Sequence, residues 1–68
     1  MLQLVLRFKG YKNMVSVQSV QEAAQRFGRV LRNHGFGEQH MLQDCGNVLV
    51  DGQVVARIES TGDIKVVA

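Results

Sequence analysis

The sequence predicts an α+β fold in the order β-α-β-β-β, with one amphipathic helix packed on one face of a small antiparallel sheet. Three observations lead to this fold class. Apolar and polar residues alternate over residues 2–8, as in a half-buried strand. Helical periodicity follows over residues 20–34. Two glycine-containing turns then divide residues 46–67 into short strands. A chain of 68 residues is expected to form a single domain, 1–68.

The first strand, residues 2–8, has an apolar face made of its even-numbered positions: Leu2, Leu4, Leu6 and Phe8. Gln3, Val5 and Arg7 take the other face. Residues 9–18 are less clear from the sequence. Gly10 and Asn13 suggest a turn, and the apolar residues after them fit an extension of the strand, a loop or a second short strand.

The helix begins after a capping-box pattern, Ser19-Val20-Gln21-Glu22, in which Ser19 can accept a hydrogen bond from the Glu22 amide. Gly35 is suited to end it in the left-handed conformation. At 100° per residue, the apolar side and His34 fall within one arc of about 120°. The members of this arc are Val20, Ala23, Ala24, Phe27, Val30, Leu31 and His34.

A loop over residues 35–45 precedes three strands at about 46–50, 53–59 and 63–67. The first turn, Asp51-Gly52, allows two registers. A two-residue loop sets Leu49 opposite Val54, whereas a three-residue loop with a bulge sets Val48 opposite Val54. We prefer the three-residue loop because it collects the larger apolar set on one face: Val48, Val54, Ala56 and Ile58. The same loop type at residues 60–62 sets Ile58 opposite Ile64.

The helix is expected to cover the sheet face that carries Leu2, Leu4, Leu6, Val48, Val54, Ala56, Ile58, Ile64 and Val66. The second face then keeps apolar residues among Arg7, Arg57 and Lys65. An apolar strip with basic neighbours is typical of an interface. The sequence therefore predicts a protein partner, which includes a second copy in a homodimer. The predicted interface residues are Val5, Leu49, Val55, Arg57 and Val67.

Charge is distributed unevenly along the chain. Six basic residues against one acidic residue give +5 in residues 1–34, and two against five give −3 in residues 35–68. Basic and aromatic residues are interleaved over residues 7–13, a mixture that suits nucleic-acid binding. The alternative prediction is therefore a small nucleic-acid-binding domain. Its candidate contact residues are Lys9, Tyr11, Lys12, Arg26, Arg29 and Arg32.

No catalytic, cofactor or metal site is expected. His34, His40 and Cys45 are metal-ligand types, but their spacing matches no compact zinc pattern. Cys45 at the start of a strand favours a core filler over a nucleophile, which would need an orienting base and an oxyanion site. The glycines fall at turns and form no phosphate-binding motif. The sequence thus predicts a non-enzymatic protein.

A cytoplasmic location is expected. The single cysteine, Cys45, fits a reducing compartment. The opening MLQLVLRFKG is interrupted by Gln3 and Arg7 and does not have the features of a signal peptide. No apolar run approaches the roughly 20 residues that span a bilayer, so no membrane association is predicted.

Residues 31–64 contain several segments that together resemble small orphan accessory proteins encoded by bacteriophages, prophages and plasmids. These segments are His34-Gly35-Phe36-Gly37, Cys45-Gly46-Asn47-Val48 and Val55-Ala56-Arg57-Ile58, followed by Gly62 and a short final strand. Many of those proteins carry an aromatic residue in the turn where this chain has Glu59-Ser60-Thr61-Gly62. The resemblance implies no catalysis. It implies an accessory protein that binds and inhibits a host bacterial system, such as a CRISPR defence complex.

Overall fold

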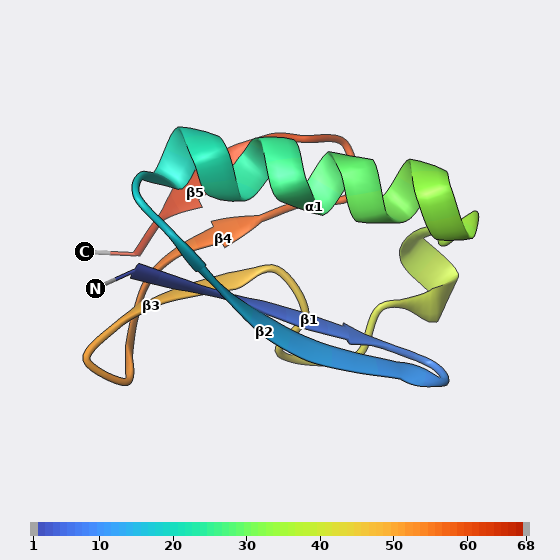
Figure 1. The fold of residues 1–68 in the computed structure, drawn as a ribbon, viewed down its shortest axis with the longest axis horizontal. Helices are drawn as coiled ribbons and strands as arrows, with labels where there is room; N and C mark the ends of the chain where they lie inside the picture. The colour runs from blue at the N-terminus through green and yellow to red at the C-terminus, as the bar shows by residue number, and fades with distance from the viewer. Residues whose placement is uncertain (1, 68) are drawn as a thin grey trace.

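The computed structural model describes residues 2–67 and confirms the α+β fold class. Five antiparallel strands form one sheet in the order β2-β1-β3-β4-β5, and one α-helix lies across it (Figure 1). The elements in chain order are β1 (Leu2–Phe8), β2 (Tyr11–Val17), α1 (Val20–His34), the short 3-10 helix η1 (Glu38–His40), β3 (Asn47–Val50), β4 (Gln53–Ile58) and β5 (Ile64–Val66).

The segment that the sequence left open forms the strand β2. Phe8 pairs with Tyr11 across a two-residue turn, and the ladder continues to the pair Leu2–Val17. Gly10 adopts φ +80° in this turn, a conformation that glycine reaches without a steric penalty. The first half of the chain is therefore a long hairpin, with β2 at the edge of the sheet.

The helix α1 has the predicted ends. The Ser19 hydroxyl accepts a hydrogen bond from the Glu22 amide at 3.1 Å. The Glu22 carboxylate reaches back to the amide of Gln18, at 3.3 Å, rather than to that of Ser19. At the other end, Gly35 adopts φ 67° and its amide donates to the carbonyl of Leu31. These caps satisfy backbone groups that a helix end otherwise leaves unpaired.

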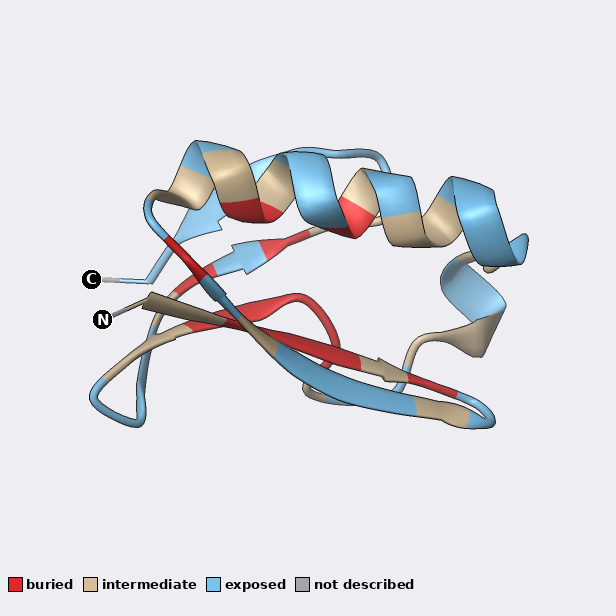
Figure 2. Cartoon of the chain, viewed as in Figure 1, coloured by how far each residue is buried: buried red, intermediate tan, exposed pale blue. Residues whose placement is uncertain are grey.

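The core lies between α1 and one face of the sheet (Figure 2). Its largest fully buried side chains are Phe8, Phe27, Leu4, Leu6, Ile58 and Val48. The prediction fails at β5, where Ile64 and Val66 are 38% and 80% exposed. Both pair with core residues of β4 and so lie on the predicted face. They are exposed because β5 is a sheet edge that α1 does not cover, and α1 contacts mainly β1, β4 and β2.

The predicted three-residue loop at the first turn of the β3–β4 hairpin is wrong. Val50 pairs with Gln53 across the two-residue loop Asp51-Gly52, and both loop residues have positive φ. This geometry matches the twist of the flanking strands. The extra residue lies further along, where Val48 pairs with Ala56 and Leu49 with Val54, which leaves Val55 as a bulge. The bulge returns Ala56 to the core face and leaves Val54 outside it, 39% exposed.

The second turn has the predicted geometry. The loop at residues 60–62 sets Ile58 opposite Ile64, and Gly62 at φ +93° donates its amide to the Glu59 carbonyl at 2.8 Å.

The loop before β3 completes the sheet beside β1. The Leu42 amide donates to the Arg7 carbonyl at 3.0 Å, and the Gly46 amide donates to the Val5 carbonyl at 2.9 Å. Gly46 has φ +88°, and a side chain there would collide with the carbonyl of Ile58. A glycine is therefore needed where the chain passes between β1 and β4.

Candidate functional site

The face of the sheet opposite α1, called the open face from here on, carries two apolar cross-strand pairs. Val5 of β1 lies opposite Met14 of β2, and Leu49 of β3 lies opposite Val54 of β4. These four residues line one groove of about 510 Å³. No second α-helix of residues 2–67 packs over them (Figure 1). Met14 is 49% exposed, so the open face presents apolar surface directly to solvent.

The open face also carries two cross-strand pairs of like charge. Arg7 lies opposite Lys12, and Arg57 lies opposite Lys65. Like charges directly opposite each other destabilise a sheet by roughly 0.2–1 kcal/mol. These pairs do not stabilise the sheet by themselves, so the four charges depend on neighbouring groups for compensation.

Acidic neighbours offset only part of this charge. Arg7 forms an ion pair with Asp44 at 3.1 Å, and Lys65 a longer one with Glu59 at 3.7 Å. Arg57 donates from Nε to the Asn47 side-chain oxygen at 3.1 Å, a neutral partner. Among residues 2–67, no carboxylate lies within 4.0 Å of Lys12. The open face therefore keeps positive charge around its apolar centre.

The structure places three of the five predicted interface residues on the open face: Val5, Leu49 and Arg57. Val5 is nevertheless buried by its neighbours there. The expected position of Val55 is wrong, because the bulge turns this side chain against the core. Val67 lies beyond β5, half-exposed, with its amide bonded to the Val55 carbonyl at 2.9 Å.

Sequence reasoning missed the open-face positions of Met14, Val54 and Lys12. Met14 and Lys12 alternate with core-facing residues of β2, but this signal could be used only once residues 11–17 were known to be a strand. Val54 was assigned to the wrong face because the alternation breaks at the bulge, and two adjacent valines give no indication of which one is the extra residue.

The six candidate nucleic-acid contacts divide into separate groups. The β1–β2 turn and the carboxyl end of α1 lie at the same end of the molecule (Figure 1). This arrangement brings Tyr11 next to His34, with ring centroids 4.9 Å apart, and Lys9 and Lys12 flank Tyr11 in sequence. Arg26 instead borders a groove with Val17, Gln18 and Glu22, near the other end of β2.

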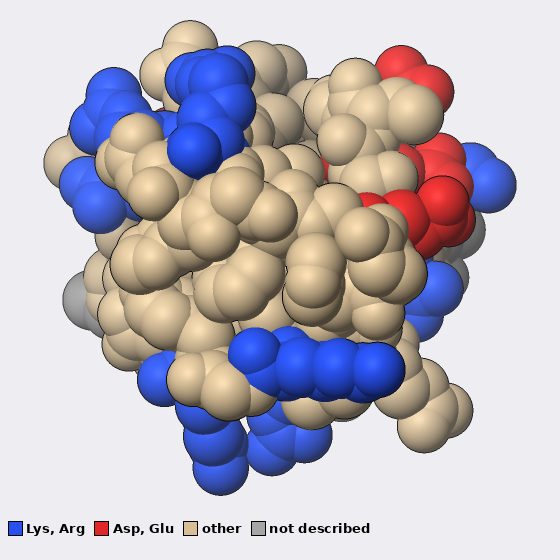
Figure 3. Space-filling view, turned by 90° about the vertical axis from the view of Figure 1, so that its right-hand side faces the viewer, with Lys and Arg blue, Asp and Glu red and all other residues tan. Residues whose placement is uncertain are grey.

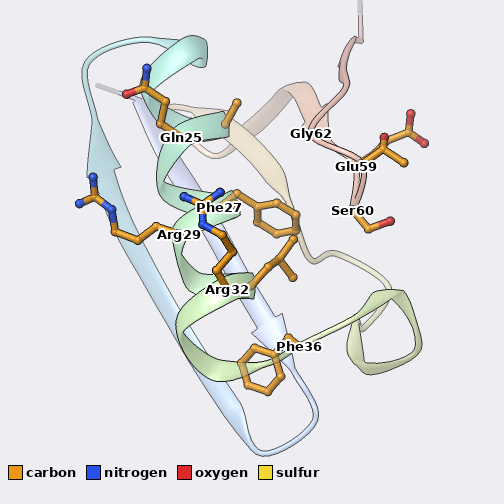
Figure 4. A pocket seen from close by; sticks show the side chains of 12 residues that line it. Gln25, Phe27, Arg29, Arg32, Phe36, Glu59, Ser60 and Gly62 are labelled. Carbon is orange, nitrogen blue, oxygen red and sulfur yellow. The ribbon is translucent and has the colours of Figure 1, made fainter.

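Arg29 and Arg32 line a different groove, of about 590 Å³, between α1 and the β4–β5 turn (Figure 4). The side chain of Glu59 points away from these arginines in Figure 4, and it pairs with Lys65 instead. The polar groups of this groove do not converge on a common point, so it lacks the arrangement typical of a small-molecule site.

Cys45 is buried in the core cluster, as the sequence predicts. Burial raises the pKa of its thiol above the ordinary value because the thiolate is poorly solvated there. The Asp44 carboxylate raises this pKa further, while a hydrogen bond with the backbone of Arg7 lowers it. A thiol with a raised pKa is a poor nucleophile at neutral pH. In the described part of the chain, no group of three His, Cys, Asp or Glu residues is placed to hold a metal ion.

Comparison of the chain with protein-family models, with curated proteins and with solved structures finds no match. Between residues 2 and 67, no helix has both the length and the apolar character needed to cross a bilayer. Any function must therefore be argued from the surfaces of the molecule, and the open face is the most distinctive of them.

Proposed function

We propose that this chain is a non-enzymatic protein–protein interaction module that binds its partner through the open face of the sheet. The observation that carries the proposal is the combination of two apolar pairs, each with one exposed member (Met14 and Val54), with two like-charged basic pairs on a face that no α-helix of residues 2–67 covers. Apolar centres with arginine nearby are typical of protein interfaces.

The partner surface is one that offers an apolar patch flanked by carboxylates. A carboxylate placed near Arg57 and Lys65 would relieve their mutual repulsion, and the same holds for Lys12. A second copy of the chain is the less favourable occupant of this face, because two copies would bring the same basic pairs together. We therefore expect a heterologous partner, and homodimerisation through this face is an outcome of the test.

The resemblance of residues 31–64 to accessory proteins of mobile elements adds a biological setting to this proposal. A small protein with a basic and apolar binding face suits an inhibitor that occupies an acidic surface of a host bacterial protein, as on a defence complex. The open-face geometry supports the binding, and the resemblance alone supports the inhibitory role.

Affinity capture from a nuclease-treated bacterial lysate tests the binding face. The test variant is Arg57→Glu/Lys65→Glu. Its control is Arg26→Glu/Arg29→Glu, which reverses the same number of positive charges but on the exposed side of α1. We expect the wild type and the control to retain the same discrete protein, and the test variant to lose it. Titration of that purified protein should then show at least a tenfold loss of affinity for the test variant, and weaker wild-type binding at high salt.

Two results would contradict the proposal. One is equal retention of the protein by the test variant and the wild type. The other is a stable dimer in sedimentation at micromolar concentration that the test variant dissociates, which would make a second copy the occupant of the open face.

A further inference from the structure

A series of near-parallel aromatic rings runs from the core to one end of the molecule. Phe8 is stacked on Phe27 with ring centroids 5.9 Å apart and on Phe36 at 4.3 Å. Phe36 is in turn stacked on His34 at 5.4 Å, with only 12° between the two planes. Phe8 and Phe27 are fully buried, Phe36 is partly buried and His34 is exposed. The series therefore ends on a planar ring that solvent reaches.

Tyr11 borders this exposed ring. Its ring centroid lies 4.9 Å from that of His34 and 5.8 Å from that of Phe36, in both cases tilted. Tyr11 is itself partly exposed. The backbone below it is fixed, because the Lys9 amide donates to the His40 carbonyl at 2.9 Å. Two partly or fully exposed rings, Tyr11 and His34, thus lie next to each other at this end, both in contact with the ring of Phe36.

Basic side chains lie around these rings. Figure 3 shows this end of the molecule, with Lys and Arg side chains above and below an uncharged centre and Asp and Glu gathered on one side. Lys9 and Lys12 flank Tyr11 in sequence and are exposed, whereas the guanidinium of Arg32 lies back near Gly28, in the groove beside the β4–β5 turn. Within residues 2–67, neither of these two lysines has a carboxylate within 4.0 Å.

From this juxtaposition we infer a second binding site, for single-stranded nucleic acid, at the end of the molecule formed by the β1–β2 turn and the end of α1. An unpaired base stacks on the rings of His34 and Tyr11, and Lys9 and Lys12 contact the flanking phosphates. Stacking a base on an aromatic side chain contributes about 1–3 kcal/mol and tolerates any base. Duplex bases are already stacked on each other, so this site favours single strands.

The site differs from the proposed protein-binding face in its residues and its chemistry. Tyr11, Phe8 and Phe36 belong to or pack against the core, on the α1 side of the sheet, whereas Val54, Arg57 and Lys65 lie on the opposite side. Lys12 lines the open-face groove and is also the neighbour of Tyr11 along the edge strand β2, so variants at other positions are needed to separate the two surfaces. Arg26, which lies elsewhere, has no part in this site.

Tyrosine emission offers a direct test, because the chain has one tyrosine and no tryptophan. The probes are an oligonucleotide of about twelve thymidines, its uridine counterpart and a duplex of equal length, with binding followed by anisotropy of a fluorescein-labelled copy. At low salt we expect single strands to bind and to quench Tyr11 emission over the same concentration range. The duplex should bind at least tenfold more weakly.

Substitutions separate stacking from charge. Tyr11→Ala or His34→Ala should lower the affinity about tenfold, and Tyr11→Phe should preserve it because the ring remains. Lys9→Glu should weaken binding and make the salt dependence shallower, whereas Arg26→Glu, with the same charge change, should have a much smaller effect. Circular dichroism of each variant confirms that the fold is intact.

Three results would overturn the inference. The first is the absence of any anisotropy change at low salt. The second is binding that leaves Tyr11 emission unchanged and that Tyr11→Ala does not weaken. The third is equal binding of duplex and single strand, which would indicate attraction by net charge alone.

Discussion

The two faces of the sheet differ in what they contribute to the protein. The face under α1 is filled by side chains that are almost fully buried, among them Phe8, Val48 and Ile58. The open face presents Met14 and Val54 to solvent and sets Arg57 opposite Lys65. One face accounts for the stability of the fold, and the other keeps features that stability alone would not select. A chain of 68 residues thereby combines a core with the surface that we propose binds a partner.

The largest expected effect is on the covered face. Phe27→Ala removes a fully buried ring from the centre of the core, with a loss of about 3–5 kcal/mol. Small domains have little stability in reserve, so this variant should be largely unfolded at room temperature. Urea denaturation followed by circular dichroism measures the difference. The control on the open face is Met14→Ala, which should cost less than about 1 kcal/mol. Similar losses in the two variants would contradict the distinction between the faces.

The bulge makes the comparison sharper, because adjacent valines face opposite sides of the sheet. Val55→Asp places a carboxylate against the core and should lower the free energy of unfolding by about 1–3 kcal/mol. Val54→Asp makes the same change in strand propensity, but the side chain at this position is exposed. Its loss in the free energy of unfolding should therefore be smaller by at least about 1 kcal/mol. Urea midpoints compare the two. A larger loss for Val54→Asp would show that the three-residue loop is the true register.

Alkaline pH tests the covered face through Cys45. Its raised pKa means that, above the ordinary thiol pKa of about 8.5, the unfolded chain loses this proton while the folded chain keeps it. Stability should therefore be unaffected by this group at lower pH and should fall as the pH rises from there through the folded-state pKa. Cys45→Ala should show a shallower decline when unfolding is measured across this range. If the stability of the wild type and of Cys45→Ala declined equally with pH, the Cys45 thiol would not be shielded from water.

The smallest expected effect has the opposite sign. Lys65→Thr removes one member of the like-charged pair with Arg57 and should raise the free energy of unfolding by about 0.5 kcal/mol. The lost ion pair with Glu59 is exposed and contributes little. The gain should shrink at high salt, which screens the repulsion. Destabilisation at all salt concentrations would show that the basic pair serves the fold after all.

The sequence predicts the parts of the fold that a single local signal, such as a helix cap or a turn, determines. The helix followed from Ser19, Gly35 and the apolar arc between them, because caps and periodicity act within a few residues. The pairing of Ile58 with Ile64 followed from a three-residue loop that ends on Gly62, which adopts positive φ.

The open face could be predicted only in part. The bulge at Val55 depends on how β3 and β4 twist against their neighbours, and no residue type marks it. The exposure of Val66 depends on which strands of the sheet α1 covers. The proximity of Tyr11 and His34 depends on the length of the β1–β2 hairpin relative to α1. Each of these is a relation between distant segments, which one-dimensional patterns do not contain.

The most direct test of the central claim is site-specific photo-crosslinking in bacterial cells, with a benzophenone side chain at position 54 or at position 66. Val66 is 80% exposed and Val54 only 39%, so exposure alone would favour crosslinks from position 66. Binding through the open face predicts the reverse. A discrete protein should crosslink to position 54 and not to position 66, and the crosslink should disappear when Arg57→Glu/Lys65→Glu is added. Stronger crosslinking from position 66 than from position 54 would contradict binding through the open face. So would a crosslink from position 54 that persists in the Arg57→Glu/Lys65→Glu variant.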